Sequence, residues 1–263
     1  MTGFNHTAGH TLDVAGAGIY FEAAGNPAGR PLVLLHGGLG CMMELNTVAE
    51  RLSPRFRLIG IDLRGHGRST LGDAGLSYAR YQADVEAVLT HLNIDKYSIL
   101  GFSDGGITGY RLALQAPLNV EKLIAVGAQW YLDPAGDAAA MLGGLDSKRW
   151  IDMFPESVRY YERVNPQPDF DRLVETVVAQ VWMDTTETGY PQENAGNIES
   201  PVLLVRGDGD ELFSLHEAAG LCSRLKEVHF LNIPFAGYEV HIDAPDVFIA
   251  AVDTFLSQQA ETD

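Results

Sequence analysis

The stretch KYSILGFSDGGITGYRLALQAP, residues 96–117, constrains the fold of this chain more than any other segment. Its first part is a short run with β-branched and aromatic character, and its second part has helical apolar spacing and stops at a proline. We therefore expect a strand that runs directly into a helix, with Ser103 at the corner. Gly101 and Gly105 flank the serine and remove the Cβ atoms that would collide in so tight a turn. Ser103 would lie exposed beside the first N–H groups of the helix, which favour a developing negative charge.

Apolar runs and helical spacings alternate along most of the chain. Buried strands are expected at residues 31–35, 56–62, 97–102, 120–128, 201–206 and 228–233, and helices at 81–92, 215–225 and 245–256. Two short alternating stretches within 11–24 predict an antiparallel pair at the sheet edge. This alternation predicts an α/β fold with a mostly parallel central sheet and helices on both faces. Active sites of such sheets lie beyond the carboxyl ends of the strands.

The alternation of strand and helix patterns stops between residues 131 and 197. This segment is rich in proline and aromatic residues and shows helical patches without a clear strand. We interpret residues 131–197 as a helical lid, and residues 1–130 and 198–263 as the core domain. Trp130, at the end of the preceding strand, and Trp182, within the lid, are candidate substrate-binding residues. The alternative is that the lid aromatics only form the lid's own small core.

Composition limits the partners that we expect. A formal charge of −17 would repel a phosphate backbone or an anionic bilayer, so we expect no nucleic acid and no membrane as partners. No long apolar run or secretory pattern appears, and cytoplasmic location is the default expectation. Cys41 and Cys222 fit no metal-ligand spacing and are expected to be free thiols, with Cys41 a packing residue or a pocket-lining one. We expect no metal and no cofactor; the oligomeric state is unknown.

Five segments in order and spacing resemble the α/β-hydrolase superfamily, of the serine esterase type. They are LLHGGLG at 34–40, IDLRGHGRS at 61–69, GFSDGG at 101–106, LLVRGDGD at 203–210 and HIDAPDVF at 241–248. The pentapeptide around Ser103 is the G-x-S-x-G nucleophile elbow of that family. The elbow is also similar to that of the biphenyl-hydrolase-like and valacyclovir-hydrolase group, in which the acidic residue after the serine receives an amino-bearing ester. For Asp104 we prefer the reading of an exposed aspartate that only favours the helix dipole.

The resemblance implies a catalytic triad and an oxyanion hole. Ser103 takes the place of the nucleophile, and Asp210, the second carboxylate of the Gly-Asp-x-Asp turn, takes the place of the acid. The family pattern assigns the oxyanion donors to the backbone N–H groups of Gly38 and Asp104. We interpret Asp208 as a turn residue.

The histidine position departs from the family pattern. The usual ending is Gly-His-x-x-His-x-Glu/Asp-x-Pro, whereas this chain has GYEVHIDAP at 237–245, which places Tyr238 at the base position and His241 at the second histidine. A phenol has a reference pKa of about 10 and is a poor base for a serine hydroxyl at neutral pH. Loss of a triad histidine can lower turnover by about 10⁶.

Three explanations are open. The chain is an inactivated or redirected hydrolase whose histidine was replaced; or it uses the pocket for binding or a non-hydrolytic reaction; or a bent loop brings His241 to Ser103 as an alternative base. We favour the first, because every other part of the hydrolase apparatus is present. The working hypothesis is a serine hydrolase of small carboxylic esters or related acyl compounds, weakened or abolished by Tyr238. The alternative is a ligand-binding or non-hydrolytic protein on the same scaffold.

Overall fold

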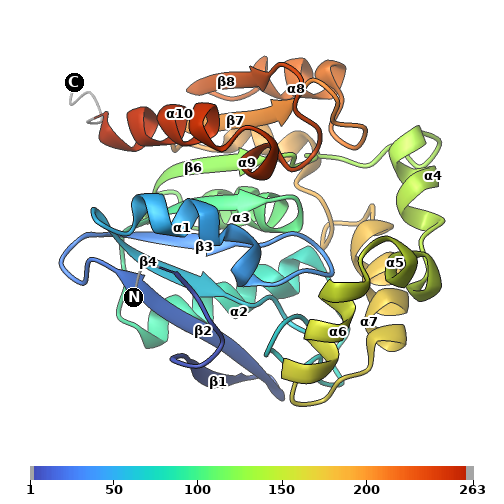
Figure 1. Cartoon of the computed structure of the whole chain (residues 1–263). Helices are drawn as coiled ribbons and strands as arrows, with labels where there is room; N and C mark the ends of the chain where they lie inside the picture. Colours follow the sequence, from blue (N-terminus) through green and yellow to red (C-terminus); the bar gives the residue numbers. More distant parts are fainter. Residues whose placement is uncertain (1–2, 259–263) are drawn as a thin grey trace.

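The computed structural model describes residues 3–258 and is built around one eight-stranded sheet (Figure 1). The strands are β1 (His10–Val14), β2 (Ala17–Gly25), β3 (Arg30–Leu35), β4 (Phe56–Ile61), β5 (Tyr97–Phe102), β6 (Val120–Val126), β7 (Val202–Gly207) and β8 (Val228–Ile233). Their order across the sheet is β1-β2-β4-β3-β5-β6-β7-β8. The β1–β2 and β2–β4 pairs are antiparallel and all other pairs are parallel. The expected fold class and the antiparallel edge are confirmed.

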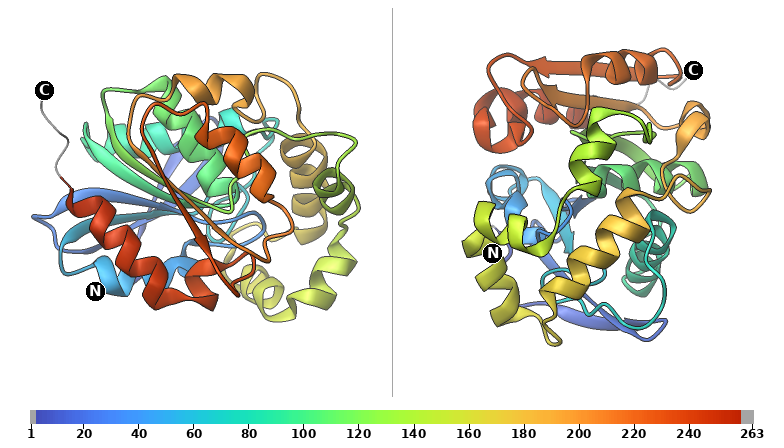
Figure 2. Two further views of the ribbon diagram at one scale, coloured as in Figure 1. Left: turned by 90° about the horizontal axis from the view of Figure 1, so that it is seen from above. Right: turned by 90° about the vertical axis from the view of Figure 1, so that its right-hand side faces the viewer.

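Helices cover both faces of this sheet, as Figures 1 and 2 show. The core helices are α1 (Asn46–Leu52), α2 (Tyr78–His91), α3 (Asp104–Gln115), α8 (Leu215–Cys222), α9 (Val240–Asp243) and α10 (Pro245–Ser257). Alternate residues of β3 enter different cores because successive side chains of a strand point to opposite faces. Val33 and Leu35 pack in the core that contains α2, α3 and α8, whereas Leu32 and Leu34 pack in the core that contains α1 and α10. A strand buried on both faces therefore appears in the sequence as a continuous apolar run.

Residues 131–197 are helical and lie at one end of the sheet (Figure 2). They contain α4 (Asp137–Gly143), α5 (Ser147–Met153), α6 (Pro155–Val164), α7 (Phe170–Val177), a π-helical turn η2 (Val178–Trp182) and a 3-10 turn η3 (Gln192–Asn197). A further 3-10 turn, η1 (Met42–Leu45), precedes α1. No strand lies between β6 and β7, all of which is within the described part of the chain. The predicted helical character of this segment is thus observed.

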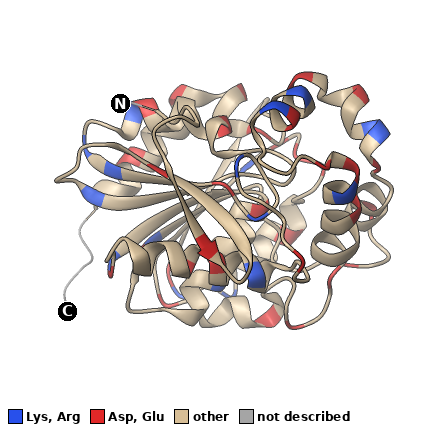
Figure 3. Cartoon of the chain, turned by 90° about the horizontal axis from the view of Figure 1, so that it is seen from below, with Lys and Arg blue, Asp and Glu red and all other residues tan. Residues whose placement is uncertain are grey.

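Charged residues are scattered over the sheet and the helices rather than segregated by element. Seen from below in Figure 3, Lys and Arg are interspersed among Asp and Glu on both the core and the helices of 131–197. Within residues 3–258, no helix is both long enough and apolar enough to span a bilayer. The expectation that nucleic acid is not a partner stays a prediction.

Candidate active site

Ser103 stands at a sharp turn between β5 and α3. Its backbone has φ 52° and ψ −119°, a conformation that a residue with a side chain rarely adopts. The turn is possible because its flanking glycines let backbone segments approach closely: a Cβ on Gly101 would lie 2.3 Å from the carbonyl oxygen of Gly105. The Ser103 N–H is anchored to the carbonyl oxygen of Val126 at 2.8 Å. This strained, anchored turn presents the Ser103 hydroxyl at the carboxyl end of the central strands.

Tyr238 occupies the space directly beside this hydroxyl. Its phenolic O–H donates a hydrogen bond to Oγ of Ser103. The ring packs against Phe102, with centroids 4.9 Å apart, and against Gly127, where a Cβ would lie 2.9 Å from Tyr238 Cε2. Burial raises the pKa of Tyr238 well above its ordinary value, and the hydrogen bond to Ser103 only partly opposes this. The phenol is therefore protonated at neutral pH and engages the lone pair of the nucleophile instead of accepting its proton.

Asp210 lies near the Tyr238 ring and has one oxygen without a partner among the described residues. Its Oδ1 accepts hydrogen bonds from the N–H groups of Leu212 at 2.9 Å and Phe213 at 2.8 Å. Its Oδ2 is buried and has no hydrogen-bond partner among the described residues. Burial raises the pKa of Asp210 to about 6. A Cβ on Gly127 would lie close to both this Oδ2, at 3.4 Å, and the Tyr238 ring.

His241 does not reach the nucleophile. It is buried with the ring edge against Phe102, at 4.8 Å between centroids, and neither of its nitrogens has a hydrogen-bond partner in residues 3–258. Burial lowers the pKa of His241 to about 4, so the imidazole is neutral. The explanation in which a bent loop brings His241 to Ser103 is not what the structure shows.

The glycine-rich loop after β3 lies against the start of α3. A Cβ on Gly38 would be 2.6 Å from Oδ2 of Asp104, so these two candidate oxyanion residues are adjacent. His36 holds the loop: its Nε2 accepts the N–H of Leu63 at 2.9 Å, so Nδ1 carries the proton and donates it to Gly37 O at 2.7 Å. The Asp104 N–H is at the first position of α3, where a backbone donor has no partner within the helix.

The prediction that Asp104 is an exposed aspartate was wrong. Its side chain is buried and accepts hydrogen bonds from Tyr78 Oη at 2.8 Å and from Trp182 Nε1 at 3.0 and 3.1 Å. Burial outweighs these bonds and raises the pKa of Asp104 to about 6. The aspartate is therefore a buried polar link between the core and the residues of 131–197, rather than a surface group that complements the helix dipole.

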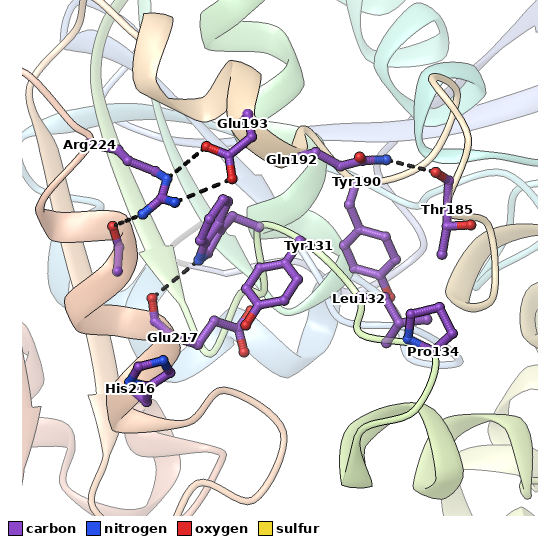
Figure 4. Close-up of a pocket in the computed structure, with 12 residues that line it drawn as sticks. Tyr131, Leu132, Pro134, Thr185, Tyr190, Gln192, Glu193, His216, Glu217 and Arg224 are labelled. Carbon is purple, nitrogen blue, oxygen red and sulfur yellow. Dashed lines mark hydrogen bonds and ion pairs between the residues drawn. The ribbon is translucent and has the colours of Figure 1, made fainter.

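A cavity of about 380 Å³ opens between the end of β6, the end of segment 131–197 and α8 (Figure 4). Trp130 lines it, together with Tyr131, Tyr190 and Glu217. The Trp130 indole donates to the main-chain oxygen of Glu217 at 3.1 Å, and Figure 4 shows the Glu217 side chain beside the ring of Tyr131. Trp182, the other candidate substrate-binding residue, does not line this cavity and bonds to Asp104 instead.

Glu217 is a site residue that sequence reasoning missed. It is buried, its Oε1 has no hydrogen-bond partner among the described residues, and burial raises its pKa to about 8. Ser214 and Glu217 have the spacing of a helix-capping box, and the Ser214 hydroxyl does accept the Glu217 N–H at 3.1 Å. No bond from the Ser214 N–H back to the Glu217 carboxylate is present among the described residues, so the capping pattern does not account for this side chain, and only the fold reveals the cavity beside it.

A serine at a strand-to-helix elbow, at the carboxyl end of a mostly parallel sheet with helices on both faces, defines the α/β-hydrolase class of proteins. Comparison with known proteins agrees. The sequence model of the alpha/beta hydrolase fold family matches residues 30–158. The pimeloyl-[acyl-carrier protein] methyl ester esterase of Nitrosomonas europaea is 26% identical over 266 residues, covering 90% of this chain and 99% of the esterase. The mouse serine hydrolase BPHL is 26% identical over 259 residues, covering 92% of this chain and 84% of that protein.

Solved structures show the same fold. A meta-cleavage product hydrolase from Pseudomonas fluorescens IP01 superposes with a TM-score of 0.78 at 20% identity, over 96% of this chain and 98% of that one. A hydrolase from Pseudomonas aeruginosa superposes with a TM-score of 0.77 at 22% identity, over 97% and 100% of the two chains. The chain belongs to the α/β-hydrolase superfamily and is, by that membership, an enzyme of the hydrolase class.

Proposed function

We propose that this protein is a serine hydrolase scaffold for small carboxylic esters or related acyl compounds, held at weak or absent activity by Tyr238. The observation that carries the proposal is the occupation of the base position: Tyr238 donates to Ser103 Oγ, while Oδ2 of Asp210 is left without a partner among the described residues. An imidazole would accept the serine proton with one nitrogen and donate to a carboxylate with the other. A phenol has a single O–H, and that proton is already directed at the nucleophile.

The proposed reaction is acyl transfer to Ser103. The serine oxygen attacks the ester carbonyl carbon, the alcohol leaves with a proton, and water then hydrolyses the acyl-enzyme to release the acid. The N–H groups of Gly38 and Asp104 are proposed to stabilise the oxyanion. Each half of this reaction needs a group that takes a proton and returns it. Tyr238 does not serve as that base, because its pKa is raised well above neutral pH.

Asp104 adds a second obstacle beside the proposed oxyanion position. Its carboxylate oxygen lies next to Gly38, and a negative charge there opposes a developing oxyanion. The hydrogen bonds from Tyr78 and Trp182 spread that charge, and the pKa of about 6 leaves the group partly protonated in mildly acidic solution. Both donors are in place, so Asp104 already has hydrogen-bond partners within the protein in this arrangement.

Residues 131–197 are proposed to act as a lid, and the cavity of Figure 4, which Ser103 does not line, is proposed to hold a part of the substrate remote from the ester group. Two observations support this. The segment contacts the elbow helix through Trp182 and Asp104, and its last part, with Tyr190, forms one wall of the cavity. Trp130 also lines the cavity and provides an aromatic surface suited to an apolar substrate group.

The experiment that tests this function is turnover of a panel of short activated esters by the wild type, Tyr238→His and Tyr238→Phe. We expect at least about 100-fold faster turnover in Tyr238→His, a fraction of the ~10⁶ that a triad histidine can contribute. Tyr238→Phe is the matched control, since it frees the serine hydroxyl without supplying a base. Adding Asp210→Asn to Tyr238→His is expected to remove most of the gain, by up to about 10⁴-fold. Equal rates in the histidine and phenylalanine variants would contradict the proposal.

A second candidate function is ligand binding without hydrolysis on the same scaffold. The cavity beside Trp130, with the Glu217 oxygen that has no partner among the described residues, favours it, because a small molecule could be held there without contact to Ser103. This function predicts saturable binding of a small molecule with no turnover, even in Tyr238→His. Detection of turnover in that variant distinguishes the two functions.

A further inference from the structure

Three side chains from distant parts of the sequence meet in the structure, and none of them belongs to the proposed catalytic residues. His6 precedes β1, Cys41 ends the loop that follows β3, and Asp62 directly follows β4. One ligand atom of each lies within 4.8 Å of the others. His6 and Asp62 are buried, and Cys41 is half-buried. A nitrogen, a sulfur and a carboxylate oxygen at this separation match the ligand types and spacing of a transition-metal site.

The imidazole of His6 is held so that one nitrogen faces Asp62. Its Nδ1 lies 2.8 Å from the hydroxyl oxygen of Tyr160 in α6. Tyr160 donates its own proton to Met43 Sδ at 2.9 Å, so the Tyr160 oxygen is the acceptor and Nδ1 of His6 the donor. Nε2 then points at Oδ2 of Asp62, 2.9 Å away. Two acceptor atoms face each other there unless a second proton or a cation lies between them.

The carboxylate of Asp62 is fixed in the same way by groups behind it. Oδ1 accepts the N–H of Met42 at 3.0 Å, and Oδ2 accepts the N–H of Arg68 at 2.7 Å. In metal sites, ligating histidines and carboxylates are oriented by hydrogen bonds to neighbouring protein groups. The bonds to His6 and Asp62 are of this kind. His6 also has a left-handed backbone, φ 58°, which is unfavourable for a residue with a side chain.

We propose that Nε2 of His6, Sγ of Cys41 and the carboxylate of Asp62 bind one Zn²⁺ ion, with water as the fourth ligand. The thiol of Cys41 would lose its proton to solvent on binding, so charge and atoms balance. The sequence showed no such site because its ligands are far apart along the chain, with none of the short spacings of zinc motifs.

The proposed ion has a structural role in this arrangement. It would join the N-terminal segment to the end of the glycine-rich loop and to the loop after β4. Through Tyr160 and His6 it would also connect to α6 of segment 131–197. None of its three ligands belongs to the proposed catalytic residues, so its presence is independent of whether the proposed hydrolysis is correct.

The test is metal binding by the full chain after removal of metals with a chelator. Titration with Zn²⁺ in a calorimeter is expected to show one site. Titration with Co²⁺ is expected to show a thiolate-to-cobalt charge-transfer band, which reports Cys41 as a ligand. Cys41→Ser and His6→Ala are expected to lower affinity by at least about 100-fold, and Tyr160→Phe by about 10- to 100-fold. Cys222→Ser is the matched control, because Cys222 is the other half-buried free cysteine.

Two outcomes would overturn the proposal. If the wild type gives no Co²⁺ charge-transfer band and no Zn²⁺ heat, the cluster is only a contact between His6 and Asp62 and holds no metal. If Cys41→Ser binds Zn²⁺ as tightly as Cys222→Ser, the ion lies elsewhere. Thermal unfolding of each metal-free variant identifies any that fails to fold. The Co²⁺ band then decides the question in the wild type and Cys222→Ser alone, since it requires a thiolate at the metal.

Discussion

The indole N–H of Trp182 donates to both carboxylate oxygens of Asp104, at 3.0 Å from Oδ1 and 3.1 Å from Oδ2. Asp104 follows the elbow serine directly, whereas Trp182 belongs to the segment 131–197. Tyr78 of α2 completes the arrangement with a 2.8 Å bond to Oδ1. This contact joins the segment to the elbow through a buried, hydrogen-bonded carboxylate, whose burial would be unfavourable without these donors.

Replacing Trp182 by phenylalanine is therefore expected to destabilise the protein. The change keeps an aromatic ring but leaves the buried Asp104 with one donor fewer, at a loss of about 1–3 kcal/mol in the free energy of unfolding. Urea unfolding near neutral pH measures it. Trp150→Phe is the matched control, because the Trp150 N–H has no hydrogen-bond partner among the described residues. Equal losses in both variants would show that the bond to Asp104 is not the cause.

Asp104 is also expected to make the stability of the protein depend on pH. Its pKa is raised from 3.8 to about 6 in the folded protein, so the folded state holds a proton that the unfolded state releases. This proton stabilises the folded state fully below about pH 4. The stabilisation is lost as the pH rises through about 6, and the free energy of unfolding falls by at most about 3 kcal/mol. Asp104→Asn lacks this group. Its stability relative to the wild type should therefore increase between about pH 4 and about pH 7. A difference that stays constant over this range would contradict the assignment.

Gly38 is expected to tolerate no side chain. In Gly38→Ala the new Cβ would lie 2.6 Å from Asp104 Oδ2 and 2.7 Å from Trp182 Cζ2, so the loop must shift. We expect a loss of about 1–3 kcal/mol in stability. In the Tyr238→His background we expect a loss of about 10²- to 10³-fold in esterase turnover, as for removal of one oxyanion donor.

Gly75→Ala is the matched control for that change. A Cβ at Gly75 has as its nearest neighbour Gln180 Oε1 at 3.7 Å, an ordinary contact. Its effect on stability should lie within about 0.5 kcal/mol. If Gly38→Ala behaves like Gly75→Ala in both stability and turnover, the loop is not packed as described and Gly38 is not an oxyanion donor.

His241 is expected to be dispensable for catalysis and to limit stability in acid. Its pKa is lowered to about 4, so protonation favours the unfolded state and stability is lost as the pH falls from about 6.5 through about 4. His241→Leu removes two buried nitrogens that lack partners among the described residues and should be neutral or stabilising, with less loss of stability in acid. Acid unfolding curves measure this. A large loss of ester turnover on adding His241→Leu to Tyr238→His would instead identify His241 as a base.

Much of this fold could be predicted because strands buried on both faces and amphipathic helices have distinct sequence periods. The expected strands at 31–35 and 201–206 correspond to β3 and β7 within one residue at each end. The four residues of α9 were missed, since one helical turn shows no period. The place of Tyr238 next to Ser103 was expected from the resemblance of residues 237–245 to the family ending, and not from periodicity.

Long-range polar contacts could not be predicted in this way. Asp104 looked exposed because its donors, Tyr78 and Trp182, are 26 and 78 residues away in the sequence. The convergence of His6, Cys41 and Asp62 is of the same kind, since no local pattern links the three. Such contacts depend on how loops and the 131–197 segment pack over the sheet, and sequence periodicity carries no information about that packing.

Tyr238 is the group proposed to disable Ser103, and the rate of labelling by a fluorophosphonate probe tests this role most directly. Tyr238→His is predicted to label at Ser103 at least about 100-fold faster than the wild type and Tyr238→Phe, with no labelling in Tyr238→His/Ser103→Ala. Labelling of the wild type as fast as Tyr238→His would contradict that role, because another group would then activate the serine. Absence of labelling in all variants would exclude the hydrolase function itself.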